Sequence, residues 1–263
     1  MQAKKIQHFN QIQKLDNLSV QSIILSSLRA ALPHPELSSW ANHLMTISPT
    51  ISSFARKALI RCLLTNANLH RWLRTKSPAC PQCGQPETQT HVLNNCSPSA
   101  VQGRYTWRHN AVLKLISTHI TPHLLPSDIL LTDIPGSRSP TELFTNILPD
   151  VTVIRDGSAH ILELTCCAEV NFEKSKVYKL NKYSNPSSSS KQLLSFHVHT
   201  LEVSSLGFVQ SSGFKAFLNS LSLPSLSDSE TRRLGEMSLR ASFFIFCCRH
   251  KPWPSQPCDP YFH

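Results

Sequence analysis

The sequence predicts an α/β protein: a mixed sheet flanked by helices, preceded by a helical segment and a small Cys/His cluster. Between residues 129 and 203, short apolar and alternating runs are typical of strands. Runs with apolar residues at helical spacing separate and flank these strands. Upstream, three cysteines and one histidine gather within residues 80–96. This alternation of patterns favours a compact sheet with helices packed on it.

The first 76 residues are predicted to be helical. Apolar residues recur at helical spacing within residues 20–28 and again within residues 54–63, and prolines interrupt the pattern. This segment has no complete fold signature, so we expect it to be a linker at the end of a longer region. The Cys/His cluster follows as a separate segment, residues 77–100.

Residues 101–223 are predicted to form the main domain. Its expected elements are a helix at 105–119, strands at 129–134, 151–155 and 160–165, a helix at 170–183, a strand at 196–203 and a helix at 211–221. Asp156-Gly157 predicts a hairpin turn between the second and third strands, and residues 185–190 a loop. A last helix, at 230–246, is expected within a C-terminal segment, residues 224–263.

The charge distribution favours an anionic partner. The net charge is +10, and between residues 38 and 127 the only acidic residue is Glu87. Such a basic block is a candidate phosphate-binding surface, although a solvated basic face without a partner is the alternative. The candidate nucleic-acid contacts are Arg71, Arg74, Lys76, Arg104, Arg108, His109 and Lys176. The triplet Arg108-His109-Asn110 could instead help to order the site, and a plain surface triplet is the alternative.

The Cys/His cluster has the spacing of a zinc site. Cys80, Cys83, His91 and Cys96 supply three thiolates and one imidazole, and zinc prefers four such ligands in a tetrahedron. Four protein ligands close the coordination shell, so the predicted site is structural rather than catalytic. The alternative is four unrelated residues in a reduced protein. The other six cysteines form no regular framework, which favours a reducing compartment over a secreted disulfide scaffold.

Two acids and a lysine-rich helix form the second candidate site. If the strands around the Asp156-Gly157 turn pair, Asp150 and Glu163 meet at one end of the hairpin, as in nucleases with a proline-aspartate and acid-x-lysine motif. Thr165 stands where the usual lysine is expected. The following helix could supply it, because a single stripe carries Glu169, Phe172, Lys176, Lys179 and Tyr183, with Lys182 beside it. Solvated strand ends and a solvated lysine-rich helix are the alternative.

Several motifs in order resemble one family. They are Asn68-Leu-His-Arg-Trp72, the Cys80–Cys96 cluster, Trp107-Arg-His-Asn110, Pro149-Asp150, Glu163-Leu-Thr165, Glu169, Lys179-Leu-Asn-Lys-Tyr183, Glu202-Val203, Gly207-Phe-Val209 and Pro252-Trp253. Together they resemble the C-terminal region of non-LTR retrotransposon polyproteins that carry a restriction-enzyme-like endonuclease, especially the NeSL and Hero groups. The resemblance covers roughly residues 50–255.

The resemblance implies a restriction-endonuclease-like, PD-(D/E)XK, fold and a Mg²⁺-dependent enzyme that nicks target DNA to prime reverse transcription. Asp150 and Glu163 would bind magnesium, and Lys179 or Lys182 would be the catalytic lysine, with Glu169 and Tyr183 in the same catalytic set. The zinc knuckle would help to hold nucleic acid, either the DNA target or the RNA of the element. The polymerase to which the module is normally fused has no counterpart in this chain.

The sequence departs from the family pattern at Asn110, at Cys166-Cys167 and at residues 204–206. These departures leave two alternatives: an inactive or domesticated nucleic-acid-binding fragment held together by zinc, and a relic without function. The N-terminus has no apolar signal-peptide core, and the late apolar run at 243–248 is too short to span a bilayer. We therefore expect an intracellular protein with no membrane partner, and the resemblance implies that it acts in the nucleus.

Overall fold

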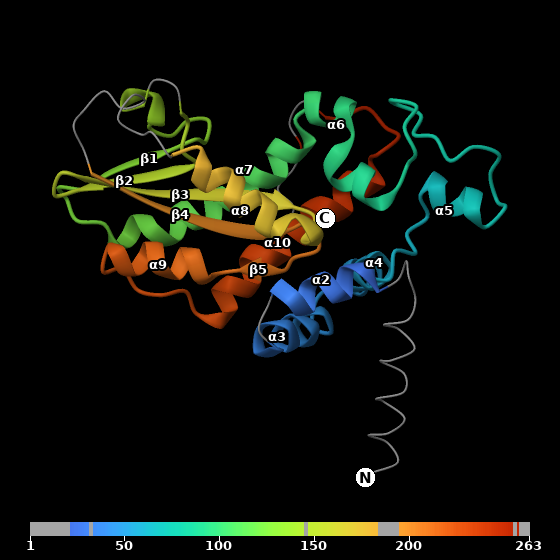
Figure 1. The fold of residues 1–263 in the computed structure, drawn as a ribbon, viewed down its shortest axis with the longest axis horizontal. Coiled ribbons are helices and arrows are strands. Elements are labelled where there is room, and N and C mark those ends of the chain that lie inside the picture. Colours follow the sequence, from blue (N-terminus) through green and yellow to red (C-terminus); the bar gives the residue numbers. More distant parts are fainter. Residues whose placement is uncertain (1–21, 32–33, 145–146, 184–194, 255–256, 258–263) are drawn as a thin grey trace, which may run out of the picture.

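A computed structural model describes residues 22–31, 34–144, 147–183, 195–254 and 257. The predicted loop at 185–190 lies outside these described residues, as do residues 1–21 and 32–33 of the segment predicted to be helical. The centre of the fold is one five-stranded sheet with the order β1-β2-β3-β4-β5 (Figure 1). The strands are β1 (Ile129–Thr132), β2 (Val151–Arg155), β3 (Ser158–Cys167), β4 (Ser195–Ser204) and β5 (Val209–Gln210).

The sheet is mixed, as predicted. Strands β1, β2 and β3 pair antiparallel, β3 and β4 pair parallel, and the short β5 pairs antiparallel with β4. Asp156 and Gly157 form the tight turn between β2 and β3 with positive φ angles of 48° and 73°. This turn sets Val151 opposite Leu162, so the next pair along the hairpin is Asp150 and Glu163.

Helices cover both faces of the sheet. On one face α7 (Arg104–Ile120), α9 (Ser212–Ser220) and α10 (Asp228–Cys247) bury the main apolar core, which includes Leu162 and Leu164 of β3. The alternate residue Ile161 points to the opposite face, into a smaller core with Phe144 and Tyr183. Helix α8 (Phe172–Asn181) lies on this second face, between β3 and β4 in the chain (Figure 1).

The N-terminal helices form a further core with the end of α10. They are α2 (Ile23–Ala31), α3 (His34–Leu44) and α4 (Pro49–Leu59), while the next helix, α5 (Asn66–Arg71), contributes no residue to this core. Trp40 of α3 stacks on Phe208 with ring centroids 3.9 Å apart. Helix α10 also lies directly against the turn after β4: a Cβ atom at Gly235 would stand 2.1 Å from the Gly207 carbonyl oxygen. Residues of α10 therefore belong to two cores rather than to a separate tail.

The predicted helices and strands of the main domain are all present, with small differences at their ends. The sequence pattern did not predict β5, and it placed the start of the helix before β4 too early, because a short 3-10 turn, Glu169–Asn171, precedes α8. The remaining short elements are a π-helical turn at His91–Asn95, α6 (Ser97–Val101) and 3-10 turns at Thr121–His123 and Pro140–Glu142. Among the described residues, no helix combines the length and apolarity that a membrane span requires.

Candidate functional site

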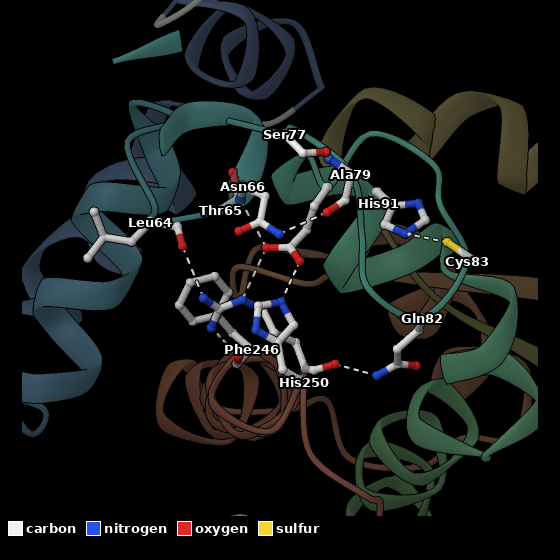
Figure 2. Close-up of polar contacts among 12 residues, drawn as sticks. Leu64, Thr65, Asn66, Ser77, Ala79, Gln82, Cys83, His91, Phe246 and His250 are labelled. Atoms are coloured by element: carbon white, nitrogen blue, oxygen red, sulfur yellow. Dashed lines mark hydrogen bonds and ion pairs between the residues drawn. The ribbon is translucent and has the colours of Figure 1, made fainter. Parts of the chain in front are cut away.

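The four predicted zinc ligands converge. Cys80, Cys83, His91 and Cys96 each offer one donor atom, and these atoms all lie within 4.8 Å of one another. Cys83 Sγ is 3.3 Å from His91 Nε2 (Figure 2). A tetrahedral zinc ion with bonds of about 2.3 Å to sulfur and 2.0 Å to nitrogen spaces its ligand atoms about 3.5–3.8 Å apart. The group could therefore hold a zinc ion.

Local backbone structure brings these ligands together. Gly84, at a φ angle of 75°, closes the turn after Cys83, and its amide donates to the Cys80 carbonyl at 2.9 Å. His91 begins the π-helical turn that ends beside Cys96. Burial raises the pKa of Cys80 to about 11 and lowers that of His91. The imidazole is therefore neutral, as a ligand must be, and zinc binding would release the Cys80 proton.

A buried carboxylate binds the Cys/His knuckle, residues 80–96, to the segments packed beside it. Glu87, which lies between Cys83 and His91 in the sequence, is fully buried. Its carboxylate accepts a hydrogen bond from the Asn66 backbone amide at 3.0 Å. The same carboxylate binds Arg249 and His250, which follow α10. Gln82 donates to the Arg249 carbonyl, so two side chains of the knuckle reach the end of α10 (Figure 2). The sequence alone marked Glu87 only as an isolated acid.

The predicted acid pair also comes together. Lys179 Nζ of α8 lies 3.0 Å from Asp150 Oδ2 and also binds Glu163 Oε2. Lys182 Nζ lies 2.9 Å from Glu163 Oε1, and the Tyr183 hydroxyl donates to the same oxygen. Asp150 Oδ2 accepts the Leu164 amide at 2.7 Å. Asp150, Glu163, Lys179, Lys182 and Tyr183 form what we call the acid–lysine cluster.

His109 also contacts this cluster, although the sequence assigned it to nucleic-acid binding. Its Nε2 lies 3.4 Å from Asp150 Oδ1, and its Nδ1 lies 3.2 Å from the Asn110 side-chain oxygen. Burial acts against the charge of His109, but the hydrogen bond and charge of Asp150 raise its pKa overall. The sequence allowed the Arg108-His109-Asn110 triplet either to steer phosphate or to help order the site. The contact with Asp150 itself depends on where α7 crosses the sheet.

The charges of the cluster stabilise one another. Burial alone would raise the pKa of Asp150, but His109 and Lys179 hold it below the usual range. Burial alone would lower the pKa of Lys179, but Asp150 and Glu163 raise it overall. Burial and the Glu163 charge raise the pKa of Tyr183, so the phenol stays protonated. Asp150 is thus held as a carboxylate by the donors around it.

Two predicted members lie apart from the cluster. Glu169 is buried beside Ser204 and Leu206, and burial raises its pKa. The sequence-based stripe assumed a continuous α-helix from Glu169, whereas the 3-10 turn before α8 changes the direction of its side chain. Lys176 is half-buried on α8, where its charge acts on Glu202. The hydrogen bonds and ion pairs that hold Asp150 and Glu163 come from other residues.

Two of the predicted phosphate contacts are buried in the structure. Arg104 and Arg108 are 0% and 1% exposed. Arg104 donates to the carbonyls of Cys248 and Lys251, both at 2.8 Å, and Arg108 is likewise bound inside the protein. A guanidinium satisfied by internal carbonyls has no surface with which to reach a phosphate. In contrast, Arg71, Arg74 and Lys76 are exposed beside the knuckle.

Asp150 and Glu163 could also hold a hard cation. The Lys179 ammonium lies between the carboxylates of Asp150 and Glu163 and contacts both. Magnesium in proteins is bound through one or two carboxylates and keeps several waters, so this pair of oxygen donors fits it.

Comparison with protein-family models and with curated proteins finds no match for this chain.

Proposed function

We propose that this protein is a Mg²⁺-dependent DNA-nicking endonuclease module with a restriction-endonuclease-like core. The observation that carries the proposal is the lysine shared by Asp150 and Glu163 at the open end of the β2–β3 hairpin. Paired carboxylates beside a lysine are the groups that metal-assisted phosphodiester hydrolysis requires. The module would serve a retrotransposon polymerase in the nucleus, where the nick primes reverse transcription.

The residues of the cluster have distinct roles in this reaction. Asp150 and Glu163 would bind the magnesium ion, which supplies charge stabilisation for the phosphate and a lowered pKa for bound water. Lys179 and Lys182, which contact these carboxylates, would orient the attacking water and offset the charge that develops on the phosphate. His109 orients Asp150, and Tyr183 orients Glu163.

The knuckle has a structural role in this proposal. It would bind one Zn²⁺ through Cys80, Cys83, His91 and Cys96 and present the exposed Arg71, Arg74 and Lys76 to nucleic acid. The target DNA is one partner, and the RNA of the element is a second. Three exposed cations on one segment would add a salt-sensitive, sequence-independent component to binding.

Plasmid nicking tests the proposal. The protein with Mg²⁺ should convert supercoiled plasmid to the open circle, and Asp150→Asn should abolish conversion while plasmid binding persists. Asp156→Asn is a matched control, because it removes the same charge at the exposed turn of the same hairpin, where asparagine tolerates the positive φ. Equal nicking by the wild type and Asp150→Asn would refute the nuclease assignment.

A second candidate function is nucleic-acid binding without cleavage. It is favoured by one observation: every carboxylate oxygen of Asp150 and Glu163 already contacts an internal donor. In that case the cluster is a structural ion-pair network. Salt-sensitive plasmid binding with no Mg²⁺-dependent nicking by the wild type would support this alternative.

A further inference from the structure

Arg108 connects the knuckle to the strand that carries Glu163. On the knuckle side, its guanidinium donates to the Leu93 carbonyl and the Asn94 side-chain oxygen, both at 3.0 Å. On the other side it donates to the Cys166 carbonyl of β3 at 3.3 Å and to Ser242 Oγ of α10 at 2.9 Å. One side chain therefore joins three parts of the fold that are distant in sequence.

The two ends of this connection are close to the two candidate sites. Leu93 and Asn94 lie in the turn between the ligands His91 and Cys96. Cys166 lies three residues after Glu163 in the same strand. In addition, the neighbour of Arg108 on α7 is His109, which contacts Asp150. The same helix segment thus touches the metal knuckle and the acid–lysine cluster.

Tyr105, one turn earlier on α7, strengthens the connection on the knuckle side. Its hydroxyl accepts from the Cys96 amide at 3.0 Å and lies 3.0 Å from the Val92 carbonyl oxygen. The turn between His91 and Cys96 is therefore held by two side chains of α7. A metal ion that orders this turn would therefore also favour its packing on α7.

The burial of Arg108 makes the connection energetically important. Its side chain is almost fully inaccessible, and its Nε already lacks a partner among the described residues. If the knuckle unfolded, the guanidinium would lose its two acceptors there and remain as a buried, poorly compensated charge. Because such a charge is far more unfavourable than an unpaired neutral group, α7 would shift rather than keep its position.

We propose that Arg108 is a positioning residue that makes the geometry of the acid–lysine cluster depend on the folded, metal-bound knuckle. Zinc in the knuckle fixes the turn at residues 91–95, the turn fixes Arg108, and Arg108 fixes α7 and the end of β3. The knuckle is then part of the support of the cutting site, besides any contact with nucleic acid. The importance of this link for cleavage rests on the proposed nuclease function, but the link itself does not.

Amide hydrogen exchange at Leu164 tests the proposal without DNA or Mg²⁺. The Leu164 amide donates to Asp150 Oδ2, so its exchange rate reports whether Asp150 is in place. Removing zinc from the wild type with a chelator should accelerate this exchange by about tenfold or more. Circular dichroism would show that β3 and the rest of the sheet remain folded.

Arg108→Lys supplies the decisive variant, because a lysine keeps the charge but cannot reach acceptors on both sides. With one zinc still bound, its Leu164 exchange should match that of the chelated wild type. Arg104→Lys is the matched control: Arg104 is equally buried one turn earlier on α7, but it donates to the C-terminal carbonyls of Cys248 and Lys251. Its Leu164 exchange should stay within about twofold of the wild type while zinc is bound.

Two results would overturn the proposal: unchanged Leu164 exchange after zinc removal, or equal exchange in zinc-loaded Arg108→Lys and Arg104→Lys. If Arg108→Lys does not fold, Asn94→Ala replaces it, since it removes a single acceptor. This variant should accelerate exchange by about threefold, and no acceleration would count against the link. Failure of plasmid nicking would leave these exchange results intact, so the two proposals fail separately.

Discussion

Replacing Lys179 by methionine should destabilise the protein in the absence of Mg²⁺. The lysine side chain is 19% exposed, while the carboxylates of Asp150 and Glu163 that it joins are 8% and 0% exposed. Methionine preserves most of the apolar stem but removes the shared cation. Two buried negative charges would then face each other, although Lys182 and His109 would still compensate part of the charge.

The expected loss follows from this environment. Removing one partner of a buried ion pair lowers the free energy of unfolding by about 3–5 kcal/mol. Because the remaining cations stay close, we expect the low end of this range, about 3 kcal/mol. Lys174→Met is the control, because Lys174 is exposed on the same helix. Its effect should stay within about 0.5 kcal/mol of zero.

Urea unfolding followed by circular dichroism, with zinc retained and no Mg²⁺ added, measures these differences. In the double variant Asp150→Asn/Lys179→Met, the repulsion disappears, so the two substitutions together should cost less than the sum of the single effects. A loss below about 1 kcal/mol for Lys179→Met would refute the reasoning, as would strict additivity in the cycle. Either result would mean that water reaches the cluster and screens its charges.

Three further predictions concern other residues. Elemental analysis should find one zinc per chain in the wild type and substantially less in Cys83→Ser; full occupancy in the variant would exclude the assigned ligand set. Burial raises the pKa of Glu169, so wild-type stability should fall as the pH rises from the unfolded-state pKa of about 4.3 towards the higher folded-state pKa. Glu169→Gln should make this decline smaller, with Glu202, whose pKa burial also raises, still contributing to it, and parallel denaturation profiles for the two proteins would contradict the prediction. Neutralising Arg71, Arg74 and Lys76 should make DNA binding less sensitive to salt, by about 0.9 in log–log slope for each phosphate that the protein no longer neutralises, and an unchanged slope would rule out this surface.

The parts of the site that local sequence rules control were predictable. A two-residue turn at Asp156-Gly157 fixes the hairpin register, and this register alone sets Asp150 opposite Glu163. Likewise, the spacing of Cys80, Cys83, His91 and Cys96 was enough to predict that their donor atoms meet. In both cases the relevant contacts follow from short stretches of chain.

Contacts between distant segments were not predictable in the same way. The burial of Arg104 depends on carbonyls at Cys248 and Lys251, more than a hundred residues away. The position of Glu169 depends on a local change from 3-10 to α-helical geometry, which a pattern with a period of 3.6 residues does not reveal. A basic residue beside a metal motif therefore indicates a phosphate contact only after its burial is known.

The burial of Glu87 has a consequence for how the protein would meet a polyanionic partner. This residue is the only acid between residues 38 and 127, and its carboxylate is enclosed by Asn66, Arg249 and His250. The surface of this whole segment thus carries no negative side chain. No acid on the surface of the segment itself opposes its attraction for a polyanion, so the rate of first encounter should be fast at low ionic strength and fall steeply as salt is added.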